Sequence, residues 1–311
     1  MNIEDFPLPK KVKDKLRKAG LESFEYIALT PAFILEGLEL EGEKVWKTVE
    51  NNLQTEKNYN FITALEHYKT YRLKIRYFTT GCRGLDGLLG GGIETGAITE
   101  FVGEFATGKT QIAHQLAVTV QLPSIKGGLE SKSLYLDTEG TFRPERIIQI
   151  AEYRGLNPEK TLKNILYARA YTSEQQIHYV KILKDIIEDE NIRLVIVDSL
   201  VNHFRSEYIG EEVYVRQRNL ARHVKDLIYI AEKFNVAVVV TNQVLSVPET
   251  YLGMPLKPAG GNVIAHGCAH RVWLRKIDEN RIAARLFDSP KNPEKEVLIT
   301  ITENGVLDYG K

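Results

Sequence analysis

Hydrophobic and polar residues follow two alternating patterns over most of the chain after residue 77. Short, nearly continuous apolar runs predict strands buried on both faces, and they cover residues 98–102, 133–137, 165–168, 194–198 and 236–241. Longer stretches between them carry apolar residues at helical spacing, notably residues 173–188 and 213–234. This alternation predicts an α/β fold with a parallel sheet covered by helices on both sides. Further β-rich runs at 271–274, 281–287, 296–302 and 306–307 have no helices between them and predict an antiparallel extension of the sheet.

The N-terminal part has a different texture. Residues 1–53 predict a small all-helical domain, with short helices at 10–19, 23–29, 31–37 and 42–53. Residues 54–76 are polar and predict a linker, so that the main core spans residues 77–311. One cluster in the first helix is basic and consists of Lys10, Lys11, Lys13, Lys15, Arg17 and Lys18. It is either a nucleic-acid patch or the solvated face of a helix.

Composition narrows the function classes. The 311 residues include 41 Lys and Arg and 41 Asp and Glu, so the formal net charge is zero. A strongly basic coat for nucleic acid is therefore excluded, and any DNA contact must come from local patches. The two cysteines, Cys82 and Cys268, have no metal-ligand spacing and fit a reducing compartment. With no signal-peptide pattern and no apolar run of membrane length, we expect a cytoplasmic protein without a membrane segment.

The most informative motif is GEFATGKT at residues 103–110, which fits G-x-x-x-x-G-K-[ST] between a predicted strand and a predicted helix. Gly103 and Gly108 let successive backbone amides turn toward an anion. Lys109 can reach the outer phosphates, and the hydroxyl of Thr110 can ligate Mg²⁺. The sequence therefore predicts a nucleotide-phosphate site in this loop, whose candidate binding residues are Gly103, Glu104, Phe105, Ala106, Thr107, Gly108, Lys109, Thr110 and Gln111.

Acidic residues end two other predicted strands. The carboxyl ends of parallel strands face the ligand crevice. Asp198 follows four apolar residues, and a buried carboxylate there is costly unless it is paired or binds a metal. We expect it to share magnesium with Thr110. Glu139 is the candidate to orient and deprotonate an attacking water, whereas Asp137 either faces the core or caps the turn.

Two long irregular stretches follow strand ends, and connections of this length are usually functional or mobile. Gln243 precedes the stretch at residues 244–262, and its amide either senses the γ-phosphate or caps the strand end. The stretch at 201–222 carries Arg216, Arg218 and Arg222 at or near helical spacing.

Several longer segments carry a family resemblance. They include TGCRGLDGLLGGGIETGAITEFVGEFATGKTQ, LYLDTEGTFRPERI, LVIVDSLVNHFRSEYIG, VAVVVTNQV, AGGNVIAH, RVWLRK and ARLFDSP. Together they resemble the RecA-type strand-exchange recombinases, and in particular archaeal RadA and its eukaryotic counterparts. The resemblance covers nearly the whole chain and is densest from residue 79 to residue 308.

This resemblance implies a RecA-type ATPase core with a helix-hairpin-helix-like N-terminal domain. It also implies ATP and Mg²⁺ as cofactors and DNA-dependent ATPase activity. The protein would form filaments on single-stranded DNA and pair that strand with homologous duplex, in DNA recombination and repair. Lys109, Glu139 and Gln243 would take part in hydrolysis, with Thr110 and Asp198 on the metal.

The family also implies roles for residues that no local pattern would single out. Arg146 would pack on adenine. Phe105, His266 and Gln243 would couple ATP to the DNA loops across the subunit interface. The segment that covers the neighbour's ATP would consist of Asp288, Ser289, Pro290 and Pro293. Self-association into a filament or ring would use an F-x-x-A motif, Phe61 and Ala64, and the candidate DNA contacts are Arg216, Arg218, Arg222 and Lys257.

Three departures from the family pattern keep a second hypothesis open. The expected glycine-containing hairpin is replaced by PLPKK at residues 7–11, the first DNA loop has Glu211 and Glu212 where a basic residue is usual, and Val247 replaces a common arginine of the second loop. Fewer positive charges weaken phosphate contacts. The intact ATP residues favour a recombinase, whereas the altered loops favour a RadA paralogue that acts as a recombination mediator, binding ATP but exchanging few strands itself. A helicase-like ATPase of the same core would explain neither the F-x-x-A motif nor the N-terminal domain.

Overall fold

The computed structural model describes residues 3–5, 8–19, 21, 27, 35, 40, 45, 61–246 and 256–310. The chain divides into two compact units, residues 1–73 and 74–311. The division between residues 73 and 74 falls within the segment predicted as a linker.

Unit 1 contains η1 (Ile3–Asp5), α1 (Lys10–Lys18) and α5 (Ala64–Thr70), and η2 (Arg72–Lys74) crosses the boundary. Its buried apolar residues are Ile3, Leu16, Leu21, Ile27, Leu35, Leu40 and Val45. The basic cluster is partly neutralised, because Lys13 and Arg17 both pair with the Glu4 carboxylate and Arg17 also pairs with Asp14. The predicted helices at 23–29, 31–37 and 42–53 lie, apart from single residues, outside the described part of the chain.

The segment predicted as a linker carries a capped helix, α5. The Thr63 hydroxyl accepts the Glu66 amide at 3.1 Å, and the Glu66 carboxylate accepts the Thr63 amide at 2.8 Å. The backbone amide and the hydroxyl of Thr63 both donate to the Glu66 carboxylate, and these two bonds lower the pKa of Glu66. This reciprocal capping box starts a helix without a buried face. The T-x-x-E pattern was the sequence signal that the linker interpretation overlooked.

Unit 2 is built on a ten-stranded sheet in the order β12-β11-β10-β9-β3-β7-β6-β4-β5, with β8 paired to β7. The parallel part comprises β3 (Ile98–Gly103), β4 (Lys132–Asp137), β5 (Ile165–Arg169), β6 (Ile192–Asp198), β7 (Ala237–Ser246) and β9 (His270–Lys276). The antiparallel part comprises β10 (Ile282–Asp288), β11 (Lys295–Thr302) and β12 (Gly305–Asp308), with β8 (Leu256–Pro258) antiparallel to β7. A separate antiparallel pair joins β1 (Tyr77–Phe78) and β2 (Ile93–Glu94). The predicted α/β fold with its antiparallel extension is therefore confirmed.

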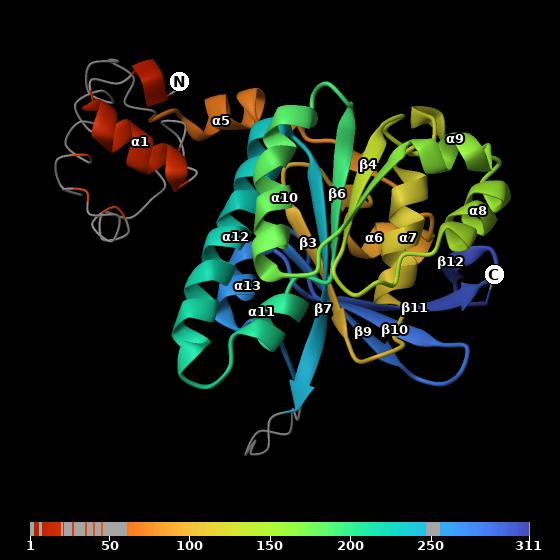
Figure 1. The fold of residues 1–311 in the computed structure, drawn as a ribbon. Helices are drawn as coiled ribbons and strands as arrows, with labels where there is room; N and C mark the ends of the chain where they lie inside the picture. The colour runs from red at the N-terminus through yellow and green to blue at the C-terminus, as the bar shows by residue number, and fades with distance from the viewer. Residues whose placement is uncertain are drawn as a thin grey trace. The chain divides into compact units, whose positions relative to one another are not determined.

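Helices cover both faces of this sheet (Figure 1). One apolar core lies under α6 (Arg83–Leu88), α7 (Lys109–Thr119), α8 (Pro144–Tyr153) and α9 (Pro158–Lys163). The other lies under α10 (Ser173–Ile186), α11 (Asn202–Glu207), α12 (Val213–Phe234) and α13 (Asn262–Gly267). Short 3-10 turns lie at η3 (Ser124–Lys126) and η4 (Gly210–Glu212). Successive strand residues alternate between the two cores, as Leu134 and Tyr135 do.

The register of the parallel strands brings their carboxyl ends to one edge of the sheet. Gly103 of β3 is opposite Gln243 of β7, and Asp137 of β4 is opposite Asp198 of β6. The sheet thus gathers the polar strand ends that the sequence singled out.

Candidate nucleotide-binding site

The phosphate loop connects the end of β3 to the first residue of α7. Gly108 is the residue before α7 and has a left-handed φ of 91°. A Cβ on Gly103 would lie 2.4 Å from the Leu274 carbonyl oxygen of β9, so this position must remain glycine. Together with its neighbours the loop lines a pocket of about 640 Å³. The start of a helix with free amides beside such a pocket is a typical anion site.

Lys109 folds back over the loop. Its Nζ donates to the carbonyl oxygens of Gly103 at 2.9 Å and Glu104 at 2.7 Å. Burial lowers the pKa of Lys109, while the negative charges of Glu139, Asp198 and Glu104 oppose this shift. The ammonium group therefore lies among carboxylates at the base of the pocket, within reach of phosphate oxygens.

Asp198 is a buried carboxylate held by hydroxyl groups. Its Oδ2 accepts the Tyr135 hydroxyl at 2.6 Å and its Oδ1 accepts the Thr241 hydroxyl at 2.5 Å. Burial raises the pKa of Asp198, and hydrogen bonds from Thr241, Tyr135 and Thr110 lower it. Thr110 and Asp198, the two predicted metal ligands, are thus brought together.

These oxygen donors suit magnesium, which keeps several water and phosphate ligands. Among the described residues, no group of three or more His, Cys, Asp and Glu side chains could hold a metal ion. A magnesium ion at Thr110 and Asp198 would therefore take its remaining ligands from water and from the nucleotide.

Glu139 and Gln243 contact each other at the mouth of the same pocket. Glu139 Oε1 accepts the Ser199 hydroxyl at 2.8 Å and the Gln243 amide Nε2 at 3.0 Å. The Gln243 side chain does not cap the end of β7. It reaches from β7 to Glu139 in the turn after β4. Its Oε1 in turn lies 3.4 Å from Arg205 Nη1.

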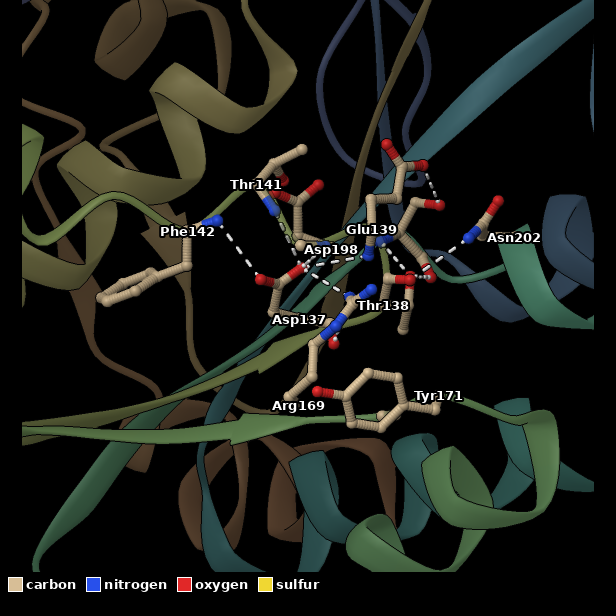
Figure 2. Close-up of polar contacts among 12 residues, drawn as sticks. Asp137, Thr138, Glu139, Thr141, Phe142, Arg169, Tyr171, Asp198 and Asn202 are labelled. Carbon is tan, nitrogen blue, oxygen red and sulfur yellow. Dashed lines mark hydrogen bonds and ion pairs between the residues drawn. The ribbon is translucent and has the colours of Figure 1, made fainter.

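Asp137 holds the turn that carries Glu139 (Figure 2). Its carboxylate accepts four backbone amides, from Glu139, Gly140, Thr141 and Phe142. It also lies 3.2 Å from Arg169 Nη1. Of the two alternatives for Asp137, capping of the turn is the observed one.

Thr138 fixes the turn from its other side (Figure 2). Its hydroxyl donates to the Ser199 carbonyl at 2.9 Å and accepts the Ser199 amide at 2.8 Å, and its own carbonyl accepts Asn202 Nδ2 at 3.2 Å. The turn is therefore bonded on both sides, which leaves Glu139 a defined position.

Arg146 contacts the helix that follows the phosphate loop directly. Its Nε donates to Gln111 Oε1 at 2.7 Å. Its other nitrogens donate to Gln149 and to the carbonyls of Glu303 and Thr302. The edge of the guanidinium is thus occupied by these acceptors.

Other predicted residues are exposed or away from the subunit's own pocket. Phe105 lies in the loop with its side chain 98% exposed, and His266 is exposed at the end of α13. The residues lining the pocket do not include Asp288, Ser289, Pro290 or Pro293. Phe61 is 90% exposed, and Ala64 is also exposed.

The predicted DNA contacts fall into two groups. Arg218 on α12 and Lys257 on β8 are exposed, whereas Arg216 and Arg222 are half-buried. The charge of Arg222 acts on Asp226, a buried carboxylate whose pKa burial raises to about 6. Arg222 is thus part of the packing of α12.

Sequence reasoning missed two kinds of residue. The hydroxyls of Tyr135, Ser199 and Thr241 support the acidic residues from within strands or turns, where spacing gives no signal. Ile209 and Tyr214, on either side of η4, are 71% and 72% exposed, and the charge pattern of this loop gives no signal for them.

A glycine loop at the end of a central strand, with carboxylates on neighbouring strand ends, defines a P-loop nucleotide-binding protein with a RecA-type core. Residues 71–309 match the Rad51 family. The chain belongs to this family. It is 45% identical over 310 residues to the DNA repair and recombination protein RadA of Aeropyrum pernix, across 99% of this chain and 97% of that protein. The resemblance inferred from the sequence is confirmed. Within the described ranges, no helix is long and apolar enough to cross a membrane.

Proposed function

We propose that this protein is an ATP-dependent DNA strand-exchange recombinase that acts in DNA recombination and repair. One observation carries this proposal. Val244 and Leu256, both within the irregular stretch at residues 244–262, line the same pocket as the phosphate loop and Glu139. The bound nucleotide and the predicted second DNA loop would therefore lie next to each other. DNA binding at that loop could then change the rate of ATP hydrolysis.

The chemistry is phosphoryl transfer from ATP to water. Bound Mg²⁺ supplies charge neutralisation for the phosphates. Thr110 and Asp198 would hold the metal, and Lys109 would hold the outer phosphates. Both hydrogen bonds to Glu139 involve Oε1, so Oε2 can orient the attacking water and take its proton.

Assembly would complete the site. Phe61 offers an exposed aromatic anchor, with Ala64 as the small residue beside it, for a pocket on the next subunit. The Asp288–Pro293 segment would cover the neighbour's ATP, with Phe105 and His266 at the interface. Because the guanidinium edge of Arg146 is occupied, its flat faces remain for stacking on adenine.

DNA binding would use Arg216, Arg218 and Lys257 on phosphates, with a smaller part for Arg222. We expect DNA of both kinds as partners, single-stranded in the filament and double-stranded as the exchange substrate. We do not favour a purely accessory role, because the hydrolytic residues Lys109, Glu139 and Asp198 share one pocket.

The test is the ATPase rate of the purified protein with and without single-stranded DNA, followed by strand exchange with no other protein added. We expect DNA to stimulate hydrolysis and to be covered by filaments in electron micrographs. A protein that binds ATP but shows neither response contradicts the recombinase assignment.

A further inference from the structure

A chain of buried polar side chains crosses three adjacent strands of the core sheet. Glu100 of β3 is fully buried between Asn242 of β7 and Arg271 of β9. Asn242 Nδ2 donates to Glu100 Oε1 at 2.7 Å, and Arg271 Nε donates to Glu100 Oε2 at 2.6 Å. Each oxygen of this carboxylate therefore binds a different neighbouring strand.

One end of this polar chain touches the nucleotide pocket. The Gln243 backbone N–H donates to Asn242 Oδ1 at 2.8 Å, and the side chain of Gln243 donates to Glu139. Asn242 Nδ2 also donates to the Ala259 carbonyl at 2.8 Å, and the Ala259 amide donates to the Gln243 carbonyl at 2.9 Å. Asn242 thus connects Gln243 to Ala259, near the end of the irregular stretch at residues 244–262.

The other end reaches the surface at Asp288. Arg271 Nη1 lies 3.8 Å from Asp288 Oδ2, and the guanidinium lies over the Phe287 ring, 4.7 Å from its centroid. Asp288 is half exposed. The polar chain therefore runs from the residue at the subunit's own pocket to the first residue of the segment that we expect to cover the neighbour's ATP.

Packing alone does not require this arrangement. A buried ion pair is often no more stabilising than apolar residues of similar volume, although loss of one partner is strongly destabilising. What it does supply is fixed geometry, because its buried members Asn242, Glu100 and Arg271 are held by directional hydrogen bonds in a low dielectric. Arg271 then meets Asp288 as an ion pair. A shift of Gln243 toward or away from nucleotide would therefore be passed to Asn242, Glu100 and Arg271.

We propose that Glu100, Asn242 and Arg271 are positioning residues that link the nucleotide state at Gln243 to the position of Asp288. Through them, the ATP site held by one subunit would be coupled to the ATP site that this subunit covers on its neighbour. This inference rests on the proposed function for the role of Asp288.

The rest of the covering segment has its own anchors, so the proposal concerns Asp288 specifically. His270 Nδ1 and Ser289 Oγ are 3.1 Å apart, and Lys291 Nζ donates to Glu94 Oε2 at 2.9 Å. A variant that breaks the polar chain should therefore uncouple Asp288 without detaching the segment.

The first experiment uses the full chain with Phe61→Ala, so that subunits stay apart and any response is internal. Backbone hydrogen exchange is measured with and without a non-hydrolysable ATP analogue and Mg²⁺. Residues 103–111 report nucleotide binding, and residues 286–292 report the covering segment. We expect protection at the first site and a several-fold change in exchange at the second. When Asn242→Ala is added, the protection at residues 103–111 should remain and the change in exchange at residues 286–292 should disappear.

The two sites separate the possible failures. Protection at 103–111 with no change at 286–292 in the Phe61→Ala parent overturns the coupling but leaves the ATP site intact. A change at 286–292 that survives Asn242→Ala overturns the role of the polar chain. No protection at 103–111 would instead contradict the proposed function, and the coupling with it.

Val240→Ala is the matched control. Val240 is fully buried on β7 and lies opposite Glu100 in the strand register, so its truncation loosens the same part of the core without touching a polar group. In the assembled wild-type protein we expect the ATPase Hill coefficient for ATP to exceed one. Asn242→Ala and Glu100→Gln should lower this Hill coefficient toward one, whereas Val240→Ala should leave it unchanged. Equal effects of all three substitutions would mean that the polar chain has only a structural role.

Discussion

The nucleotide pocket and the first predicted DNA loop are built in opposite ways. At the pocket, Asp198 and the turn-capping Asp137 behind Glu139 are buried and bonded to several donors each. In the loop, Ile209 and Tyr214 are mostly exposed. Catalysis needs charges and dipoles that are already in place, whereas a contact to a flexible strand can be formed by side chains that order on binding.

The largest effect is expected from Glu139→Gln. Glutamine keeps an oxygen for Ser199 and Gln243 but cannot take a proton, so hydrolysis should fall about 10²- to 10⁴-fold. ATP affinity should change little. Single-turnover hydrolysis and equilibrium binding measure the two separately. A variant that hydrolyses ATP within about tenfold of the wild type would remove Glu139 from the role of base.

Lys109→Ala should weaken ATP binding by about 100-fold or more, since it removes charge-assisted bonds to phosphate from a desolvated site. Titration calorimetry with ATP and Mg²⁺ measures this directly. Lys126→Ala is the matched control, because Lys126 is exposed on η3 and does not line the pocket. Normal ATP binding by Lys109→Ala would contradict the assignment of the phosphate loop.

The contrast between the rigid pocket and the exposed loop also explains which residues the sequence could predict. Residues at strand ends in a regular sheet are placed by periodicity, so Glu139, Asp198 and Gln243 could be assigned to one pocket in advance. Their supporting hydroxyls could not, because nothing in the spacing of Tyr135 or Thr241 distinguishes them from packing residues.

Elements without a buried face were the least predictable. Helix α5 buries none of its residues and begins at the Thr63–Glu66 capping box, so the polar residues before it favoured a linker. The polar chain from Gln243 to Asp288 joins residues far apart in sequence, and only the strand order reveals it. The roles of Phe61, Arg146 and the Asp288–Pro293 segment came from family resemblance and stay predictions.

In the first loop, Tyr214→Ala should weaken binding of single-stranded DNA by about 5- to 100-fold if the ring stacks on a base. Stacking involves no phosphate, so the slope of log affinity against log salt should remain unchanged. Fluorescence anisotropy at several salt concentrations measures both quantities. Tyr153→Ala, a half-exposed tyrosine on α8, is the control.

Arg218→Ala should give the complementary result. Loss of one phosphate contact should weaken binding at low salt and reduce the salt slope by about one. If instead Tyr214→Ala changes the slope and Arg218→Ala does not, the assignment of stacking and charge to these side chains is reversed.

The smallest effect concerns the packing behind the first loop. Asp226 on α12 is buried, and among the described residues its Oδ2 has no hydrogen-bond partner. Burial raises its pKa from 3.8 to about 6, while Arg222 and Lys181 oppose the shift. Because the folded state holds this proton more tightly, Asp226 costs stability as the pH rises from about 4 to about 6, and the cost stays constant above that window.

Asp226→Asn removes this titration and should therefore stabilise the core at pH 7.5 by about 2 kcal/mol, since the net pKa shift already includes the attraction to Arg222 and Lys181. The gain should shrink toward pH 4.5. Urea unfolding at both pH values, followed by Trp273 fluorescence in a Trp46→Phe background, gives the difference from the matched parent. A gain that is independent of pH would mean that Asp226 is not the titrating group. A loss at pH 7.5 would mean that the attraction of this carboxylate to Arg222 and Lys181 outweighs the cost of its burial.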